Sequence, residues 1–210
     1  MSILPGFDEN DPEAGGKIAG VTSGIVSKNE DPDGLGRIRL KLPWRDETFE
    51  TDWVRVATPM GGSAMGMFFL PEVGDEVLVG FDRNDIRFPY VLGSLWSRAA
   101  KPPQTNADGK NAIRVIHTRA GHTLLFDDGD KGKIEIKLAD GKSVTLDADG
   151  ITIDDSANTI KLDAKGGTVS IEAKQELKLK APKISIAASA SMEIKGGQML
   201  KAEATMVKIN

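Results

Sequence analysis

The sequence predicts an all-β protein in which a small closed barrel is followed by a long stack of short strands. Three observations predict this class. Apolar residues recur with a period of two, helical periodicity is weak throughout, and one pair of apolar residues at i and i+2 repeats from Ile134 to the end. Nine of the eleven aromatic residues lie between Trp44 and Trp96, so the two parts have cores of different kinds.

The amino-acid composition excludes several classes of protein. The chain has 210 residues, a formal net charge of -4 and no cysteine, which excludes disulfides, cysteine-ligated metals and thiol redox chemistry. Residues 1–16 are rich in Gly, Pro and acidic residues, and we expect a flexible segment and no signal peptide. No stretch approaches the roughly 20 apolar residues of a membrane helix. We therefore expect the chain to be made in the cytoplasm and kept there until something larger carries it out.

Residues 17–98 predict a five-stranded barrel, and the OB type is the commonest candidate. Turn residues separate its strands, as in Asp31-Pro-Asp-Gly34 and Pro71-Glu-Val-Gly74. The expected strands are Lys17–Ser27, Gly36–Leu42, Asp52–Thr58, a hairpin-like run through Gly66–Leu70 and Glu76–Phe81, and Tyr90–Trp96.

The charges of this barrel argue against nucleic-acid binding. Residues 17–98 contain ten Lys and Arg against twelve Asp and Glu, whereas proteins that bind single strands need a basic groove with stacking aromatics. Arg37, Arg39 and Lys41 alternate on one expected strand, but an acidic run follows at once. We interpret these charges as a solvated face or a docking surface.

Residues 99–112 are polar and interrupted by proline, which is typical of a linker, and the boundary is expected near Lys101. Beyond the linker, residues 113–210 carry the repeat, whose units start 7 to 10 residues apart. Burying two aliphatic side chains stabilises less than ordering about eight residues costs, so one unit cannot fold alone. The pairs must face a shared axis, either in a solenoid or in three chains wound around one another.

The repeated pairs supply the expected core of such a three-chain prism. The trimer-core residues that we expect are Ile151, Ile153, Ile160, Leu162, Val169, Ile171, Leu177, Leu179, Ile184, Ile186 and Ile194.

We expect no catalytic, cofactor or metal site. His122 lies near Asp127 but has no nucleophile pattern beside it, and we interpret it as structural. Asp147 and Asp149 lack the further ligands that a calcium loop needs, as do Asp154 and Asp155. We interpret these carboxylates as parts of corner turns.

Five segments, in this order, resemble the OB domain of the family of phage baseplate assembly protein V and VgrG spikes. They are Asp31–Arg37, Lys41–Trp44, Trp53–Pro59, Phe69–Gly80 and Pro89–Trp96. Downstream, Thr118–Asp128 and Ile134–Leu138 resemble the neck of that family, and the repeats resemble its needle.

The resemblance implies the structural central spike of a contractile injection machine, and no enzyme. Such a spike is a homotrimer that caps the inner tube and pierces the target envelope when the sheath contracts. Three OB domains would form a collar, and three C-terminal segments would intertwine in a triangular β-helix. The resemblance also implies a separate hub protein above the collar. At the C-terminal end we expect a PAAR-like tip protein to cover the strand ends at Val207, Ile209 and Asn210.

Two other classes remain open at this stage. A secreted adhesin or enzyme on a single-chain β-solenoid would be monomeric, which a mass measurement distinguishes from a trimer. A nucleic-acid-binding OB protein would bind oligonucleotides at low salt.

Overall fold

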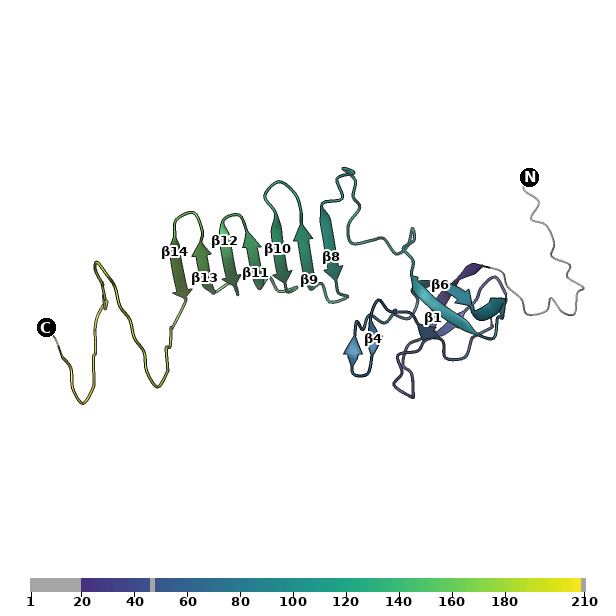
Figure 1. Ribbon diagram of the computed structural model, residues 1–210, viewed down its shortest axis with the longest axis horizontal. Helices are drawn as coiled ribbons and strands as arrows, with labels where there is room; N and C mark the ends of the chain where they lie inside the picture. The colour runs from purple at the N-terminus through teal and green to yellow at the C-terminus, as the bar shows by residue number, and fades with distance from the viewer. Residues whose placement is uncertain (1–19, 46–47, 209–210) are drawn as a thin grey trace, which may run out of the picture. The chain divides into compact units, whose positions relative to one another are not determined.

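The computed structural model describes residues 20–45 and 48–208, and the chain divides into two compact units between Lys110 and Asn111. Among the described residues, every regular element is a β-strand except one short 3-10 helix, η1 (Asp82–Asn84) (Figure 1). The predicted all-β class is therefore confirmed. None of the described helical residues forms a helix long and apolar enough to cross a membrane.

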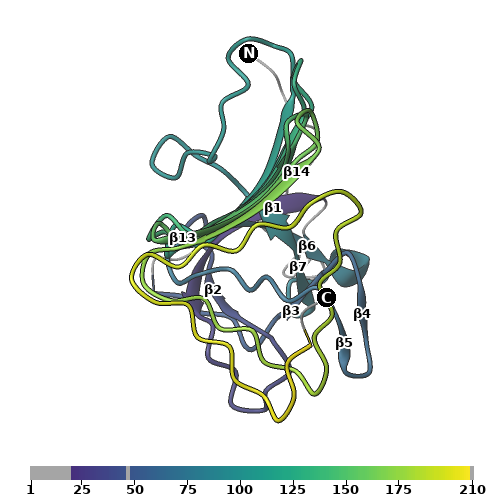
Figure 2. The ribbon, with the colours of Figure 1, turned by 90° about the vertical axis from the view of Figure 1, so that its left-hand side faces the viewer.

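The first unit is a closed barrel, and its strands are labelled in Figure 2. Its strands are β1 (Val21–Lys28), β2 (Arg39–Lys41), β3 (Arg55–Val56), β6 (Glu76–Phe81) and β7 (Pro89–Ser94). They follow the order β2-β1-β6-β7-β3, and only the pairing of β3 with β7 is parallel. Two backbone hydrogen bonds between Ile38 and Val54, with N···O distances of 3.0 and 2.7 Å, join the two ends of the sheet. The predicted OB-type barrel is confirmed.

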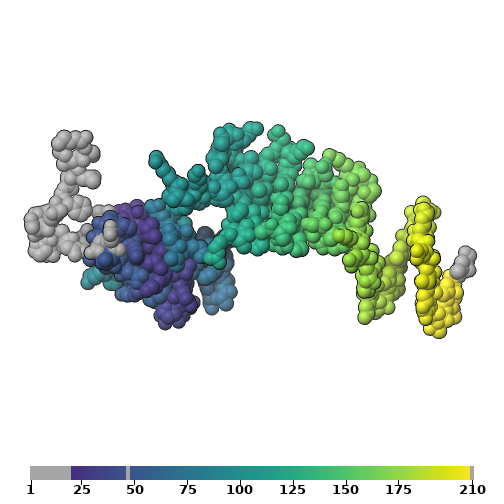
Figure 3. All heavy atoms as spheres, turned by 180° about the vertical axis from the view of Figure 1, so that it is seen from behind, coloured from purple at the N-terminus to yellow at the C-terminus, as the bar shows by residue number. Residues whose placement is uncertain are grey.

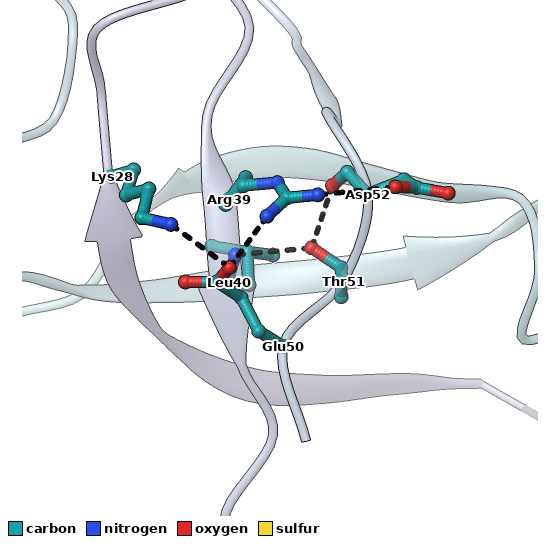
Figure 4. A network of polar contacts seen from close by, with 6 residues as sticks. All are labelled: Lys28, Arg39, Leu40, Glu50, Thr51 and Asp52. Carbon is teal, nitrogen blue, oxygen red and sulfur yellow. Dashed lines mark hydrogen bonds and ion pairs between the residues drawn. The ribbon is translucent and has the colours of Figure 1, made fainter. Parts of the chain in front are cut away.

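Alternate side chains of the barrel strands point inward and form its core. Along β6 every second residue is buried, as expected of a strand with one face against a core. The buried apolar side chains are Val26, Ile38, Leu40, Leu42, Val54, Val77, Val79, Phe81 and Val91. Thr51 is buried beside them. Its hydroxyl accepts the Leu40 N–H at 3.0 Å and donates to the Asp52 carbonyl at 2.8 Å (Figure 4).

One expected pairing differs from the structure. The run Gly66–Leu70 does not pair with β6, which instead lies between β1 and β7. A separate small hairpin of β4 (Gly61–Gly62) and β5 (Met65–Gly66) precedes it. Gly66 has a φ of +144°, and a Cβ there would lie 2.5 Å from the Met60 carbonyl oxygen. The chain therefore turns at a position that only glycine accommodates, which apolar alternation alone does not predict.

One carboxylate closes the loop between β1 and β2. Asp31, whose side chain is only 3% exposed, accepts hydrogen bonds from Arg37 Nη2 at 2.7 Å and Arg37 Nε at 2.8 Å. It also accepts three backbone N–H groups, those of Asp33, Leu35 and Arg37, at 3.1 to 3.2 Å. The bonds from Arg37, followed by those from the backbone, hold the pKa of Asp31 well below its ordinary value of 3.8.

We expect this carboxylate to make the barrel sensitive to acid. Because the pKa of Asp31 is lowered on folding, its stabilising effect is present above the ordinary value and is lost progressively between about pH 5 and pH 1. Asp31→Asn should lower the unfolding temperature at pH 7 and remove part of the acid sensitivity. All three tryptophans, Trp44, Trp53 and Trp96, belong to this unit, so tryptophan fluorescence measures its unfolding.

Asp85→Asn is the matched control. Asp85 pairs with Arg87, two residues away and 77% exposed, and this bond also lowers the pKa of Asp85. Because solvent screens so exposed a pair, Asp85→Asn should lower the unfolding temperature less than Asp31→Asn does. Unfolding temperatures at pH 7 that are equal for Asp31→Asn and the unchanged protein would contradict the role given to Asp31.

The second unit contains a seven-stranded antiparallel sheet in which each strand pairs with the next along the chain (Figure 1). Its strands are β8 (Ile113–His117), β9 (Thr123–Asp127), β10 (Lys133–Lys137), β11 (Ser143–Asp147), β12 (Gly150–Asp154), β13 (Asn158–Asp163) and β14 (Thr168–Ala173). After Ala173 the described residues 174–208 contain no strand and follow an extended, winding path (Figure 3). Viewed along the stacking direction, the seven strands overlap as one curved layer (Figure 2). Residues 174–208 turn away from this layer.

Candidate oligomerisation surface

One face of the seven-stranded sheet carries two continuous columns of apolar side chains. Residues directly opposite each other on paired strands share a face, so the register fixes which residues belong to each column. The first column contains Phe126, Ile134, Leu146, Ile151, Leu162 and Val169, and the second contains Ile116, Leu124, Ile136, Val144, Ile153, Ile160 and Ile171. This two-column surface is termed the apolar face.

The opposite face of the sheet is mostly polar. The row between the two columns points the other way and contains Val115, Leu125, Glu135, Thr145, Thr152, Lys161 and Ser170. From β10 onward this row has no apolar member. The sheet is therefore amphipathic, with one face suited to water and one to a packed interior.

The apolar face remains exposed in the single chain. Ile151, Ile153 and Ile160, on the central strands, keep 37%, 44% and 38% of their surface accessible, and Val169 near the end keeps 70%. The buried apolar cluster of the described residues lies entirely in the barrel. A continuous exposed apolar surface of this kind marks a site of protein association.

The structure places the expected trimer-core residues in two groups. Six of them, Ile151, Ile153, Ile160, Leu162, Val169 and Ile171, lie on the apolar face. The other five, Leu177, Leu179, Ile184, Ile186 and Ile194, lie in the extended segment after β14, with 52% to 70% of their surface exposed. Of the expected tip-docking residues, Val207 lies at the end of that segment, and Ile209 and Asn210 lie outside the described residues.

The apolar face begins earlier than the sequence repeat that predicted it. Ile116 on β8 and Leu124 and Phe126 on β9 belong to the same columns as the later pairs. The signal was present in the sequence, because Leu124 and Phe126 are also an i, i+2 pair. The adjacent Leu125 obscured it, since a run of three apolar residues does not alternate.

The aspartates of the sheet close its turns. In each of three turns, an aspartate Oδ1 accepts the backbone N–H groups two and three residues further along the chain. The distances are 2.8 and 3.1 Å for Asp147, 2.9 and 2.6 Å for Asp155, and 3.0 and 2.8 Å for Asp163. The bond from the Gly166 N–H is the main cause that lowers the pKa of Asp163. This recurrent geometry supports the interpretation of these carboxylates as turn caps.

His122 also has a structural position. Its Nδ1 accepts the Ala139 N–H at 3.1 Å, which links the turn after β8 to the turn after β10. Its own backbone N–H donates to the Thr118 hydroxyl at 3.1 Å. Both contacts are made with turn residues of the sheet, which supports a structural role for His122.

A depression of about 600 Å³ lies between the turns at one edge of the sheet, lined in part by Asp127, Lys131, Asp149 and Lys165. Lys165 Nζ lies 2.5 Å from Asp149 Oδ1, and this hydrogen bond lowers the pKa of Asp149. Within residues 20–45 and 48–208, no three His, Asp or Glu side chains are placed to hold a metal ion. The depression is therefore a surface hollow between turns, and an ion pair between Asp149 and Lys165 lies at it.

Three cations of the barrel, Lys28, Arg37 and Arg39, are paired with carboxylates, and Figure 4 shows the pairs of Lys28 and Arg39. Arg39 Nη1 lies 2.6 Å from Glu50 Oε2 and its Nη2 lies 3.2 Å from Asp52 Oδ1, while Lys28 Nζ lies 3.3 Å from the same Glu50 oxygen. Arg37 is held by Asp31. Paired cations attract phosphate weakly, so the arrangement does not favour a nucleic-acid groove.

Two family models match the chain, one in each unit. Residues 22–96 match the type VI secretion system/phage-baseplate injector OB domain, and residues 114–186 match the phage baseplate V C-terminal trimerisation domain. The two matches together cover more than two thirds of the chain and follow the order of the barrel and the sheet.

Curated relatives carry the same region within much longer chains. The type VI secretion system spike protein VgrG4b of Pseudomonas aeruginosa is 28% identical over 142 residues, which are 66% of this chain and 17% of the relative. The actin cross-linking toxin VgrG1 of Vibrio cholerae is 26% identical over 151 residues, 66% of this chain and 14% of the relative. The spike protein VgrG2a of Pseudomonas aeruginosa is 33% identical over 82 residues, 37% of this chain and 10% of the relative.

The chain thus spans less than a fifth of the length of these relatives. The barrel, the amphipathic sheet and both domain matches agree on one assignment. The chain belongs to the family of phage baseplate V and VgrG-type spike proteins of contractile injection and type VI secretion systems.

Proposed function

We propose that the chain acts as the central spike of a contractile injection machine, as a homotrimer that caps the inner tube and pierces the target envelope. Its role is mechanical rather than enzymatic. The three OB barrels form a collar, and the three C-terminal segments form a three-faced prism. The observation that carries this proposal is the apolar face. No described residue of the single chain covers its two columns, and they lie in the region that matches a trimerisation domain.

Threefold packing removes the apolar face from water. Three curved sheets, each with its apolar face turned inward, enclose a single interior, and each polar face is left outside. The paired columns then meet at the axis at a spacing of about 4.8 Å per strand. A prism of this kind transmits an axial load through continuous backbone ladders, which suits a structure that is pushed through an envelope.

The prism has two zones under this proposal. In residues 113–173 the ladder lies within each chain. In residues 174–208 the apolar pairs continue, but the described backbone contains no strand. Because buried backbone groups need hydrogen-bond partners, we propose that neighbouring chains supply the ladder there, as in an intertwined β-helix.

A mass measurement tests the trimer directly. Analytical ultracentrifugation of the purified chain should give three times the mass of the 22.5 kDa polypeptide. A single species at the mass of one chain would contradict the proposal and favour the monomeric solenoid. A separate hub above the collar and a tip protein at the C-terminal end are further proposals. Each is tested by whether a second protein co-purifies with the trimer from its native source.

A further inference from the structure

In residues 174–208 the charged side chains and the apolar pairs point to opposite faces of the extended chain. This segment contains seven Lys and three Glu, with no Asp or Arg. Successive side chains of an extended chain point to opposite faces, and each charged residue is an odd number of positions from the nearest apolar pair. Lys178, for example, lies between Leu177 and Leu179, and Lys183 precedes Ile184. If the pairs face the axis, all ten charges face outward.

The net charge changes sign where the sheet ends. Residues 113–173 contain eight Lys and Arg against eleven Asp and Glu, a net of -3, whereas residues 174–208 have a net of +4. The change follows Ala173, the last residue of β14. The segment from residue 174 to 208 is termed the basic segment.

The three glutamates of the basic segment are already paired. Lys178 lies 2.6 Å from Glu176, and Lys195 lies 2.5 Å from Glu193. Lys201 pairs with Glu203 in the same way. Within the described part of the chain, the lysines of this segment that have no ion pair are Lys174, Lys180, Lys183 and Lys208. Their charge is available to an external anion.

We propose that the basic segment binds the anionic headgroups of a lipid bilayer. The inference rests on the proposed function, because a trimer would place twelve net positive charges around the distal part of the spike, three times the +4 of one chain. Each lysine near an anionic bilayer strengthens binding about fivefold. The segment contains no aromatic residue, whereas proteins that bind single-stranded nucleic acid stack the bases on aromatic side chains. A bilayer is therefore the anionic surface that fits best.

Vesicle co-sedimentation with the full chain tests the proposal. We expect binding to vesicles of phosphatidylcholine with phosphatidylglycerol, little binding to phosphatidylcholine alone, and release at high salt, where the screening length falls from about 10 Å at 0.1 M to about 3 Å at 1 M. The double variant Lys180→Ser, Lys183→Ser should weaken binding about 25-fold or more. The matched control, Lys137→Ser with Lys161→Ser, removes the same charge from the polar face of the sheet and should bind as the unchanged protein does.

The outcomes separate this proposal from the proposed function. A trimer that binds neutral and anionic vesicles equally, or loses equal affinity in both double variants, would overturn the lipid proposal and leave the spike intact. Tighter binding to a single-stranded oligonucleotide than to anionic vesicles would also overturn it. A monomer in ultracentrifugation would instead contradict the proposed function.

Discussion

Ile153→Asp is expected to abolish trimer formation, whereas Thr152→Asp, one residue away on the same strand, should leave the trimer intact. Ile153 lies in the second apolar column, between Val144 and Ile160, and is 44% exposed in the single chain. Thr152 points to the polar face beside Lys161. The two variants add the same charge to the same strand, so a difference between them isolates the face of the sheet.

The expected effect is large because the substitution is repeated in each chain. Losing the burial of one Ile removes about 2 kcal/mol per protomer, or about 6 kcal/mol for three, which corresponds to roughly a 10⁴-fold loss in association. Three carboxylates near one axis add a desolvation cost to that loss. Ultracentrifugation over a range of protein concentrations measures the change. An Ile153→Asp trimer as stable as that of Thr152→Asp would show that this face does not line the axis.

The barrel could be predicted from the sequence because its signals are local. Alternation marks the strands, and turn residues such as those at Asp31-Pro-Asp-Gly34 separate them. The hairpin of β4 and β5 escaped prediction, since its strands are two residues long and its glycines have no side chains to alternate. The carboxylate network around Asp31 also could not be predicted, because it depends on Arg37 folding back over the loop.

Most residues of the apolar face could be predicted, but their pairing could not. An i, i+2 pair such as Ile160 and Leu162 specifies a strand with one apolar face and leaves open which strand lies beside it. The sequence was equally compatible with a solenoid and with three wound chains. The register of β12, β13 and β14 is what aligns the pairs into columns. The end of pairing within the chain at Ala173 has no signal in the repeat, which continues unchanged past it.

Gly150→Ala is expected to destabilise the sheet far more than Gly167→Ala, although both glycines have a positive φ. Gly150, the first residue of β12, has a φ of +140°, and Gly167, just before β14, has a φ of +64°. A Cβ on Gly150 would lie 1.8 Å from the Leu162 carbonyl oxygen, whereas a Cβ on Gly167 would have nothing within 4 Å. Gly167→Ala therefore adds only backbone strain, of about 1–2 kcal/mol.

Gly150→Ala adds a backbone clash to that strain, and a carbonyl group in a ladder has no room to move. Relief requires β13 to shift away from β12, which breaks the pairing of Gly150 with Asp163 and displaces Leu162 from its column. We expect a loss of about 3 kcal/mol or more per protomer, and a weaker trimer as a consequence. Urea unfolding followed by far-ultraviolet circular dichroism, at one fixed protein concentration, measures both variants. Because the two substitutions add the same methyl group, equal losses of stability would mean that the close contact between β12 and β13 at Gly150 does not exist in solution.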